Sequence, residues 1–196
     1  MDKIDHQAEE KRLRDELQQA EHVQTELDRR VFYLKTLYDV SKDIFSSVES
    51  ETILRSFLLM AMGNFGVTQG FILGINSPDR GIRHFVEVGL EADEVADLTG
   101  GIEQLLKNDA FAETIDKAAK PMLQEFLPPS LDFIQGFTVG EDSPGIFGLG
   151  AKLIGEPYNE NDAELLDTLV NNLIVALKNA RSFEEIKKLN RNPVSY

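Results

Sequence analysis

The sequence predicts an α+β fold: a central antiparallel sheet, helices from both ends of the chain on one of its faces, and long helical extensions at the two termini. Three observations lead to this prediction. Two pairs of short apolar runs flank turns rich in Gly, Pro, Ser and acidic residues, which is typical of β-hairpins. A heptad pattern occupies the N-terminal part of the chain. A second long helical pattern closes it.

Residues 1–46 are predicted to form one long helix for signalling or coiled-coil pairing. Its mostly apolar seam positions alternate in steps of four and three, as in a left-handed coiled coil. These positions are Leu13, Leu17, Ala20, Gln24, Leu27, Val31, Leu34, Tyr38 and Ser41. The alternative is a single amphipathic helix lying on its own domain. The stretch before Leu27 carries too much mixed charge for a core helix, so we expect it to pair with a second copy of the chain.

Residues 47–160 are expected to form the globular core, which begins with a short turn and a helix. The apolar pattern of that helix stops near Gly63 or Gly66, and glycine is the usual residue at a helix C-terminus. A hairpin is then predicted from strands at residues 70–75 and 84–88, with a Pro-Asp-Arg-Gly turn between them.

An irregular insert separates this hairpin from a second one. Residues 92–120 have a helical pattern that we expect to stop at Gly100-Gly101, and residues 121–127 suit a short strand or a turn. The second hairpin is predicted from strands at residues 133–140 and 146–154. Within it, Gly148 and Gly150 are expected to be gaps on one face of a strand, against which another group packs closely.

Residues 161–190 are predicted to form the closing helix, followed by a tail at residues 191–196. Asn161 is a suitable N-cap, and Glu164 would complete a capping box three residues further on. Asp162 adds negative charge at the positive end of the helix dipole.

The first and last helices are together expected to hold two copies of the chain as a homodimer. The residues predicted at this interface are Leu17, Leu27, Val31, Leu34, Leu166, Leu173, Leu177 and Ala180. All of them occupy apolar positions of the two helical patterns.

Composition excludes several classes of function. With 196 residues and 42% hydrophobic content, the chain can bury one core. A net charge of −14 without a basic cluster argues against binding to nucleic acid or to an anionic membrane surface, because both require Lys and Arg patches. No apolar run reaches the length of a membrane span and the N-terminus is highly charged, so we expect a cytoplasmic location.

The chain contains no cysteine, which excludes disulfides, thiolate metal sites and thiol redox chemistry. Its three histidines are far apart in sequence, so no metal site is predicted. No Gly-x-Ser-x-Gly turn or catalytic triad pattern is present either. We therefore predict no catalytic residue and no enzyme activity.

Two stretches resemble the last strand, loop and closing helix of GAF domains, the small-molecule-sensing and dimerising modules common in bacterial signalling proteins. They are Gly148-Leu-Gly-Ala-Lys-Leu-Ile-Gly-Glu-Pro-Tyr-Asn-Glu-Asn-Asp-Ala-Glu-Leu-Leu166 and Ala176-Leu-Lys-Asn-Ala-Arg181. The resemblance covers residues 34–189. It implies a sheet of about six strands, terminal helices on one face, and a ligand pocket on the other face beneath the insert.

The cyclic-nucleotide-binding branch of that family has an Asn-Lys, Phe, Asp-Glu signature. Ala151-Lys152, Tyr158 and Asp162-Ala163 stand at the corresponding positions. Lys152 and Asp162 match, which implies a structural ion pair between the last strand and the last helix. The two alanines argue against cyclic-nucleotide binding. The missing cysteine argues against a covalent bilin and against the branch that reduces methionine sulfoxide.

A pocket for an unidentified small molecule is the best functional hypothesis from the sequence. Its predicted apolar walls are Phe71, Leu73, Phe85, Phe137 and Phe147, and its predicted polar groups are His84, Gln135 and Thr138. The alternative is that the aromatic side chains fill the core.

The sequence therefore favours a cytoplasmic sensory module that forms a parallel homodimer through its terminal helices and controls an attached output domain or a separate signalling partner. The rival hypothesis is a ligand-free module for dimerisation or protein interaction. No cofactor is predicted with certainty beyond the possible ligand.

Overall fold

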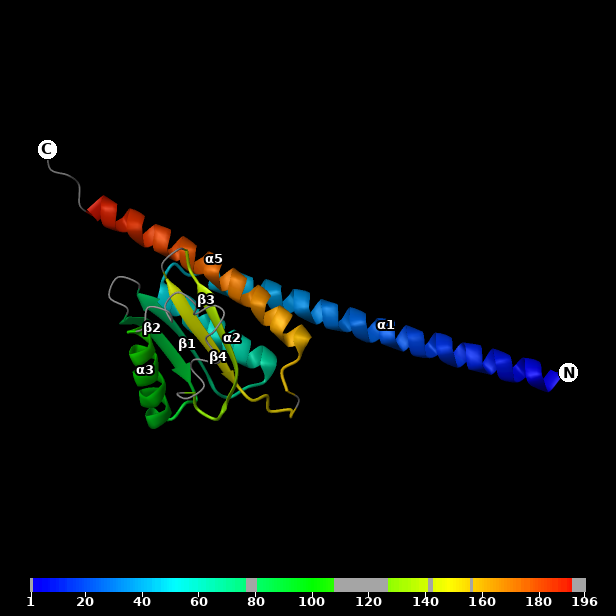
Figure 1. Ribbon diagram of the computed structural model, residues 1–196. Coiled ribbons are helices and arrows are strands. Elements are labelled where there is room, and N and C mark those ends of the chain that lie inside the picture. Colours follow the sequence, from blue (N-terminus) through cyan, green and yellow to red (C-terminus); the bar gives the residue numbers. More distant parts are fainter. Residues whose placement is uncertain (1, 77–80, 108–126, 141–142, 156, 192–196) are drawn as a thin grey trace. The chain divides into compact units, whose positions relative to one another are not determined.

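A computed structural model describes residues 2–76, 81–107, 127–140, 143–155 and 157–191 (Figure 1). The chain divides into two compact units, Met1–Asp39 and Val40–Tyr196, and each is described here by itself. Helix α1 (Asp2–Ile44) makes up the first unit, and its last turn belongs to the second.

The second unit contains the sheet. In chain order its elements are α2 (Ser50–Phe65), β1 (Gly70–Asn76), β2 (Gly81–Val88), α3 (Ala92–Leu106), β3 (Leu131–Thr138), β4 (Pro144–Gly150) and α5 (Glu160–Arg191). The strands lie in the order β2-β1-β4-β3, and every neighbouring pair is antiparallel. The α+β class and both hairpins are therefore as predicted. Four strands are present in the described part of the chain, and the six implied by the family resemblance are not confirmed.

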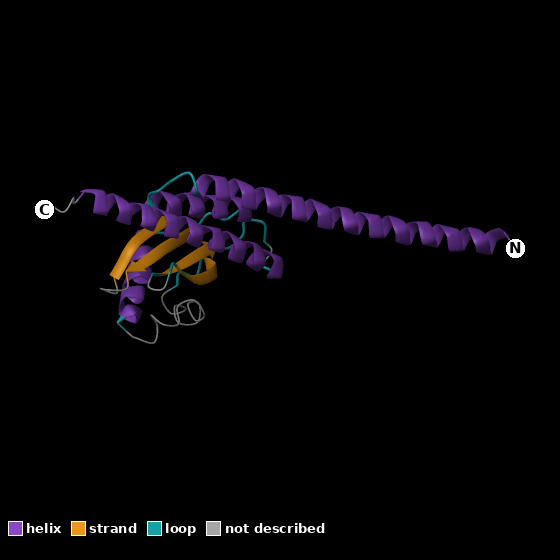
Figure 2. Ribbon diagram, turned by 90° about the horizontal axis from the view of Figure 1, so that it is seen from above, coloured by secondary structure: helices purple, strands orange, loops and turns teal. Residues whose placement is uncertain are grey.

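Helices cover both faces of the sheet (Figure 2). The face that packs against α2 and α5 is called the helix face, and the face that packs against α3 is called the insert face. On the helix face, the rings of Phe57 from α2 and Phe147 from β4 meet edge to face, with centroids 5.2 Å apart. Ile72 is paired with Phe147 across the sheet and therefore shares this face.

The insert face carries a second apolar layer. Side chains of the strands and of α3 form one cluster there: Phe71, Leu73, Ile75, Leu98, Ile102, Leu106, Leu131, Ile134 and Ile146. Each of them is less than 9% exposed. Successive side chains of β1 alternate between the two faces, so that Phe71 and Ile72 point to opposite sides of the sheet.

Two helix ends test the glycine predictions. Helix α2 ends at Phe65, where Gly66 takes a left-handed conformation with φ 61° and its N–H donates to the Met62 carbonyl, as the sequence indicated. The stop predicted at Gly100-Gly101 is wrong, because α3 continues through both glycines to Leu106. Burial of Leu98, Ile102 and Leu106 against the sheet outweighs the cost of about 1 kcal/mol for each helical glycine.

Other predicted boundaries also change. Strand β4 ends at Gly150 rather than at Ile154, and beyond it only an isolated bridge joins Lys152 to Val67. Leu153 and Ile154 are exposed, so burial gives no reason to extend the strand. The strand or turn predicted at residues 121–127 and the tail at residues 191–196 lie almost wholly outside the described residues.

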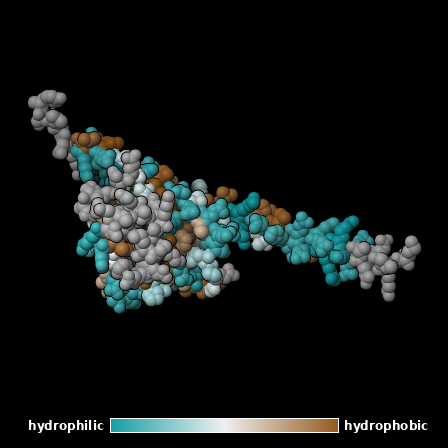
Figure 3. Space-filling model, in the orientation of Figure 1, coloured by the Kyte–Doolittle hydropathy of each residue, from teal (hydrophilic) through white to brown (hydrophobic). Residues whose placement is uncertain are grey.

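Helix α1 has a mainly charged surface, on which i,i+4 ion pairs join Arg12 to Glu16 and Arg14 to Glu10. Figure 3 shows hydrophilic side chains over much of this helix, interrupted by apolar ones. Those apolar side chains include most of the predicted seam. The first unit thus consists of one helix that offers apolar side chains to solvent.

Candidate functional site

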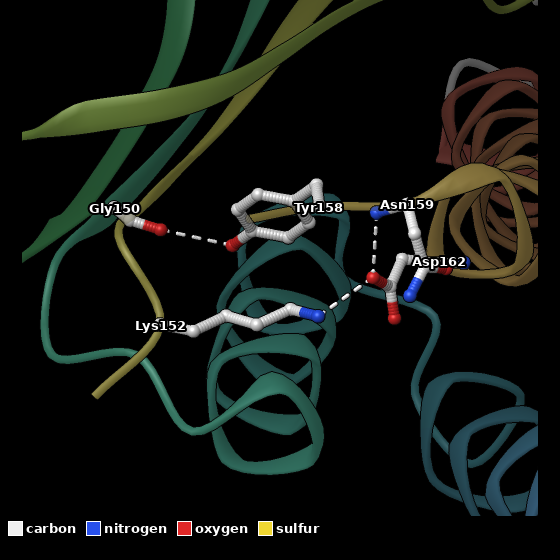
Figure 4. Close-up of polar contacts among 5 residues, drawn as sticks. All are labelled: Gly150, Lys152, Tyr158, Asn159 and Asp162. Atoms are coloured by element: carbon white, nitrogen blue, oxygen red, sulfur yellow. Dashed lines mark hydrogen bonds and ion pairs between the residues drawn. The ribbon is translucent and has the colours of Figure 1, made fainter. Parts of the chain in front are cut away.

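The predicted ion pair is present at the junction between β4 and α5 (Figure 4). The Nζ atom of Lys152 lies 2.6 Å from Oδ2 of Asp162, and both side chains are only 14% exposed. The same Oδ2 accepts a hydrogen bond from the backbone N–H of Asn159 at 2.9 Å. Asp162 therefore connects the chain that leaves β4 to the first turn of α5.

The N-cap of α5 is Asn159, not Asn161. The side-chain oxygen of Asn159 accepts the Asp162 N–H at 3.0 Å, and the Asp162 carboxylate accepts the Asn159 N–H in return. This is a reciprocal capping box. Asn161 and Glu164 are both exposed and lie inside the helix, so the predicted box was placed two residues too late.

Tyr158 completes this junction. Its hydroxyl donates to the Gly150 carbonyl at 2.9 Å, and its ring packs 5.3 Å from the ring of Phe133. Lys152 Nζ lies 5.2 Å from the ring centroid, within cation–π range. Burial raises the pKa of the Tyr158 phenol, and the negative charges of Asp132 and Asp162 raise it further. Every polar group of this junction is used for structure, so we assign it a bracing role.

The eight predicted pocket residues do not form one pocket, because the sheet divides them between its two faces. Strand pairing and alternation place Phe71, Leu73, Phe85 and Thr138 on the insert face. They place His84, Gln135, Phe137 and Phe147 on the helix face. The prediction for this second group is therefore corrected.

On the insert face, the described side chains of the strands and of α3 pack against one another. Phe71 and Leu73 are fully buried, and Leu98 and Ile102 of α3 cover them. The Phe71 ring also lies over Gly148, where no side chain competes for the space. The close packing expected at this glycine is thus confirmed.

A hollow of about 550 Å³ lies beside α3. Its described lining is Glu94, Ala96, Asp97, Gly100, Gly101, Leu127, Pro128 and Pro129. None of the eight predicted pocket residues contributes to it, and the charged groups of this lining are acidic.

A smaller cavity of about 60 Å³ lies on the helix face, where β2, the start of α2 and the middle of α5 come together. Its lining is Ser50, Leu54, Gly74, Ile75, Arg83, His84, Phe137, Val139, Ser143, Pro144, Leu177, Arg181 and Glu184. His84 and Phe137 were predicted as pocket residues, whereas the charged members were missed. One signal for them is visible in the sequence, since Arg83 directly precedes His84.

The described ionisable side chains of this cavity are Arg83, His84 and Arg181 together with one acid, Glu184. Arg83 and Glu184 form a long ion pair of 3.8 Å, and their side chains are 36% and 38% exposed. Burial lowers the pKa of His84, and the Arg83 charge lowers it further, while Glu51 and Glu184 oppose the shift. The lowered pKa of His84 favours the neutral imidazole.

Neither a metal centre nor a membrane span is found among the described residues. No group of three His, Asp or Glu side chains there is arranged to hold a metal ion. No helix in the described ranges is both long and apolar enough to cross a bilayer.

The predicted dimer residues also divide into two sets. On α1, Leu17, Leu27, Val31 and Leu34 are all more than half exposed. On α5, Leu166, Leu173, Leu177 and Ala180 are at most 8% exposed. The α5 residues are covered by the same chain, because this side of the helix packs on α2 and the sheet, and they have no surface left for a second copy.

The fold is shared with several solved structures. The GAF domain assigned to a sensor histidine kinase from Pseudomonas syringae pv. tomato matches with a TM-score of 0.50 and 15% identity, over 84% of this chain and 96% of that one. The GAF domain of an Acinetobacter phosphoenolpyruvate-protein phosphotransferase matches with a TM-score of 0.51 and 16% identity, over 76% and 94% of the two chains.

A third match is a transcription factor of the LuxR family from Burkholderia cenocepacia that depends on N-acylhomoserine lactone. Its TM-score is 0.50 at 10% identity, over 75% of this chain and 96% of that one. No family model matches the sequence, and no curated protein is significantly similar to it. The chain therefore has a GAF-like fold, as the resemblance implied.

Proposed function

We propose that this chain is a regulatory domain of a signalling protein and that it pairs with a second copy through the seam of α1. The observation that carries the proposal is the exposure of that seam: Leu17, Leu27, Val31 and Leu34 are 62%, 51%, 63% and 67% exposed. They recur at coiled-coil spacing, and burying such a side chain stabilises a complex by about 1.5–3 kcal/mol.

The GAF-like fold supports the regulatory part of this proposal. Two similar structures are GAF domains taken from a sensor kinase and from a phosphotransferase. By this analogy the domain acts on an attached output domain or on a separate signalling partner, with no catalytic step of its own. The proposal keeps the cytoplasmic location expected from the sequence.

A second candidate function is a ligand-free module for dimerisation or protein interaction. The closed packing of Phe71 over Gly148 on the insert face favours it, because that is the face on which a ligand was expected. Both candidates require the dimer, and they differ only in whether a small molecule binds. Native mass spectrometry separates them, since extra mass that is lost on denaturation would identify a bound ligand.

Sedimentation velocity tests the dimer directly. Leu27→Lys places a charge in the seam and should shift the protein to monomer at micromolar concentration. Phe32→Lys is the matched control, because Phe32 is 47% exposed on the same helix but lies outside the seam. It should remain dimeric. A Leu27→Lys protein that sediments as the wild-type dimer, or a wild-type protein that sediments as a monomer, contradicts the proposal.

A further inference from the structure

The small cavity on the helix face is lined by two arginines, although arginine is uncommon in the second unit. Between residues 40 and 190 the structure describes three arginine side chains, Arg55, Arg83 and Arg181. Two of these three, Arg83 and Arg181, line the same cavity. They come from different elements, an outer strand of the sheet and the last helix, so local sequence does not account for their meeting.

The hydrogen-bond donors of this cavity are largely unused. Within the described residues, the Arg181 guanidinium has no ion pair or hydrogen bond, and Arg83 has only the long contact with Glu184. The His84 ring and the hydroxyls of Ser50 and Ser143 have no hydrogen-bond partner there either. These groups provide several donors, and among the lining residues that the structure describes Glu184 is the one charged acceptor.

The net charge of the described lining matches a single anion. Among the described lining residues, two arginines and one glutamate give a net charge of +1, which one singly charged ligand would neutralise. Glu51 lies near His84 but is exposed to solvent and outside the lining. A volume of about 60 Å³ is sufficient for a carboxylate group.

We infer that this cavity binds the carboxylate group of a small organic acid, which sits between Arg83 and Arg181 and displaces Glu184 from Arg83. Planar carboxylates are the preferred partners of the guanidinium fork. The 3.8 Å spacing of the resident pair is longer than a charge-assisted hydrogen bond, which leaves Arg83 open to a better placed carboxylate.

This inference goes beyond the proposed function and does not depend on the dimer. It provides a link to regulation, because Arg181 and Glu184 both belong to α5 while Arg83 belongs to β2. Binding would replace a contact between sheet and helix by a contact through the ligand. The free energy of binding would in this way be coupled to the position of α5.

A titration of the ¹⁵N-labelled full chain with sodium acetate tests the inference by NMR. Sodium chloride replaces acetate point by point, so that the ionic strength stays constant. We expect saturable shifts of the Arg83, His84 and Arg181 amide signals in the millimolar range. Inorganic phosphate forms a second arm, and it should bind more weakly because its second charge is not balanced in the cavity.

Three variants define the site. Arg181→Gln should raise the acetate dissociation constant about tenfold, since it removes one charge-assisted hydrogen bond. Gly74→Ala should raise it as well, because the added methyl enters the cavity, where only His84 Cδ2 comes within 4 Å, at 3.9 Å. Glu184→Gln should lower it, because it removes the competing carboxylate. Arg55→Gln is the control on the exposed side of α2 and should leave the constant unchanged.

Several results would overturn the inference. Shifts that never saturate, or that are the same in Arg181→Gln as in the wild type, would show that acetate does not bind in the cavity. Tighter binding of phosphate than of acetate would rule out the carboxylate preference. Weaker acetate binding in Glu184→Gln would rule out the displacement of Glu184. Sedimentation of the same samples reports on the dimer separately, so failure here is distinct from failure of the proposed function.

Discussion

Lys152 and Asp162 stand ten positions apart in the chain and are joined by an ion pair of 2.6 Å between Nζ and Oδ2. The two residues lie on either side of the connection from β4 to α5. The same carboxylate oxygen accepts the Asn159 N–H, so one side chain both caps the helix and anchors it to the end of the sheet. Removing it should therefore affect two interactions together.

Asp162→Ala should lower the free energy of unfolding by about 1–3 kcal/mol, because it removes the carboxylate half of the capping box and leaves the largely buried Lys152 without its ion-pair partner. Urea unfolding followed by circular dichroism measures the change. Glu164→Ala, at an exposed position in the same helix, should stay within about 0.5 kcal/mol of wild type. Equal losses in the two variants would contradict the capping arrangement.

The raised pKa of Tyr158 predicts a loss of stability at high pH. The unfolded chain ionises this phenol near its ordinary pKa of 10.0, whereas the folded chain keeps it protonated at higher pH. The unfolded state then binds fewer protons, so the free energy of unfolding falls as the pH rises above about 10.

Tyr158→Phe isolates this effect. Below about pH 10 the wild type should be more stable by about 0.5–1.5 kcal/mol, because of the hydrogen bond to Gly150. The difference should shrink as the pH rises further, and urea unfolding at a series of pH values measures it. A difference that stays constant would show that Tyr158 ionises equally in both states.

Gly148→Ala should destabilise the sheet. A Cβ atom at this position would overlap the Phe71 ring and lie 2.7 Å from Ile134 Cδ1. Overpacking of this kind costs about 1–3 kcal/mol, measurable as a lower urea midpoint. Gly63→Ala is the matched control, because Gly63 lies in α2 with no atom within 4 Å of an added Cβ. It should be neutral or stabilising by up to about 1 kcal/mol, and the opposite order of stability would refute the packing described for Gly148.

Leu173→Ala distinguishes a core residue from an interface residue on α5. Leu173 is fully buried within the chain, so its truncation should cost about 2–5 kcal/mol and leave any dimer of the folded protein intact. Val175→Ala, two positions away and 48% exposed, should change stability by less than about 0.5 kcal/mol. Thermal unfolding and sedimentation together measure both outcomes. A Leu173→Ala protein that is as stable as the wild type but monomeric would show that Leu173 belongs to the dimer interface.

Periodicity was enough to predict the elements of the fold. The two hairpins, the long first helix and the closing helix follow from apolar spacing, and Gly66 and Gly148 take the roles that their missing side chains suggest. The helix end predicted at Gly100-Gly101 was wrong because one side of α3 is buried against the sheet. This burial is a tertiary effect, which helix propensity along the sequence does not report.

The cap of α5 could not be chosen from the sequence alone. Asn159 and Asn161 are both followed by an acidic residue three positions later, so both satisfy the pattern of a capping box. Lys152 favours the first of them, because it holds Asp162 from the end of β4. This contact depends on how the chain folds back after the strand.

The eight predicted pocket residues divide between the two faces of the sheet for a reason that the strand pattern already implies. His84 and Phe85 are neighbours in β2, and neighbours in a strand face opposite sides of a sheet. One pocket could not include both side chains. Arg181 could not be predicted at all, since its partners across the cavity come from β2 and α2, more than ninety positions earlier in the chain.

The bracing at Asp162 also limits how α5 can move. A slide of one helical turn, about 5.4 Å, would break the ion pair and both hydrogen bonds of the cap together. A pivot about the first turn would preserve all three and displace the distant turns most. The first turn of α5 is in this respect fixed to the end of the sheet, and Arg181 and Glu184 lie further along the same helix.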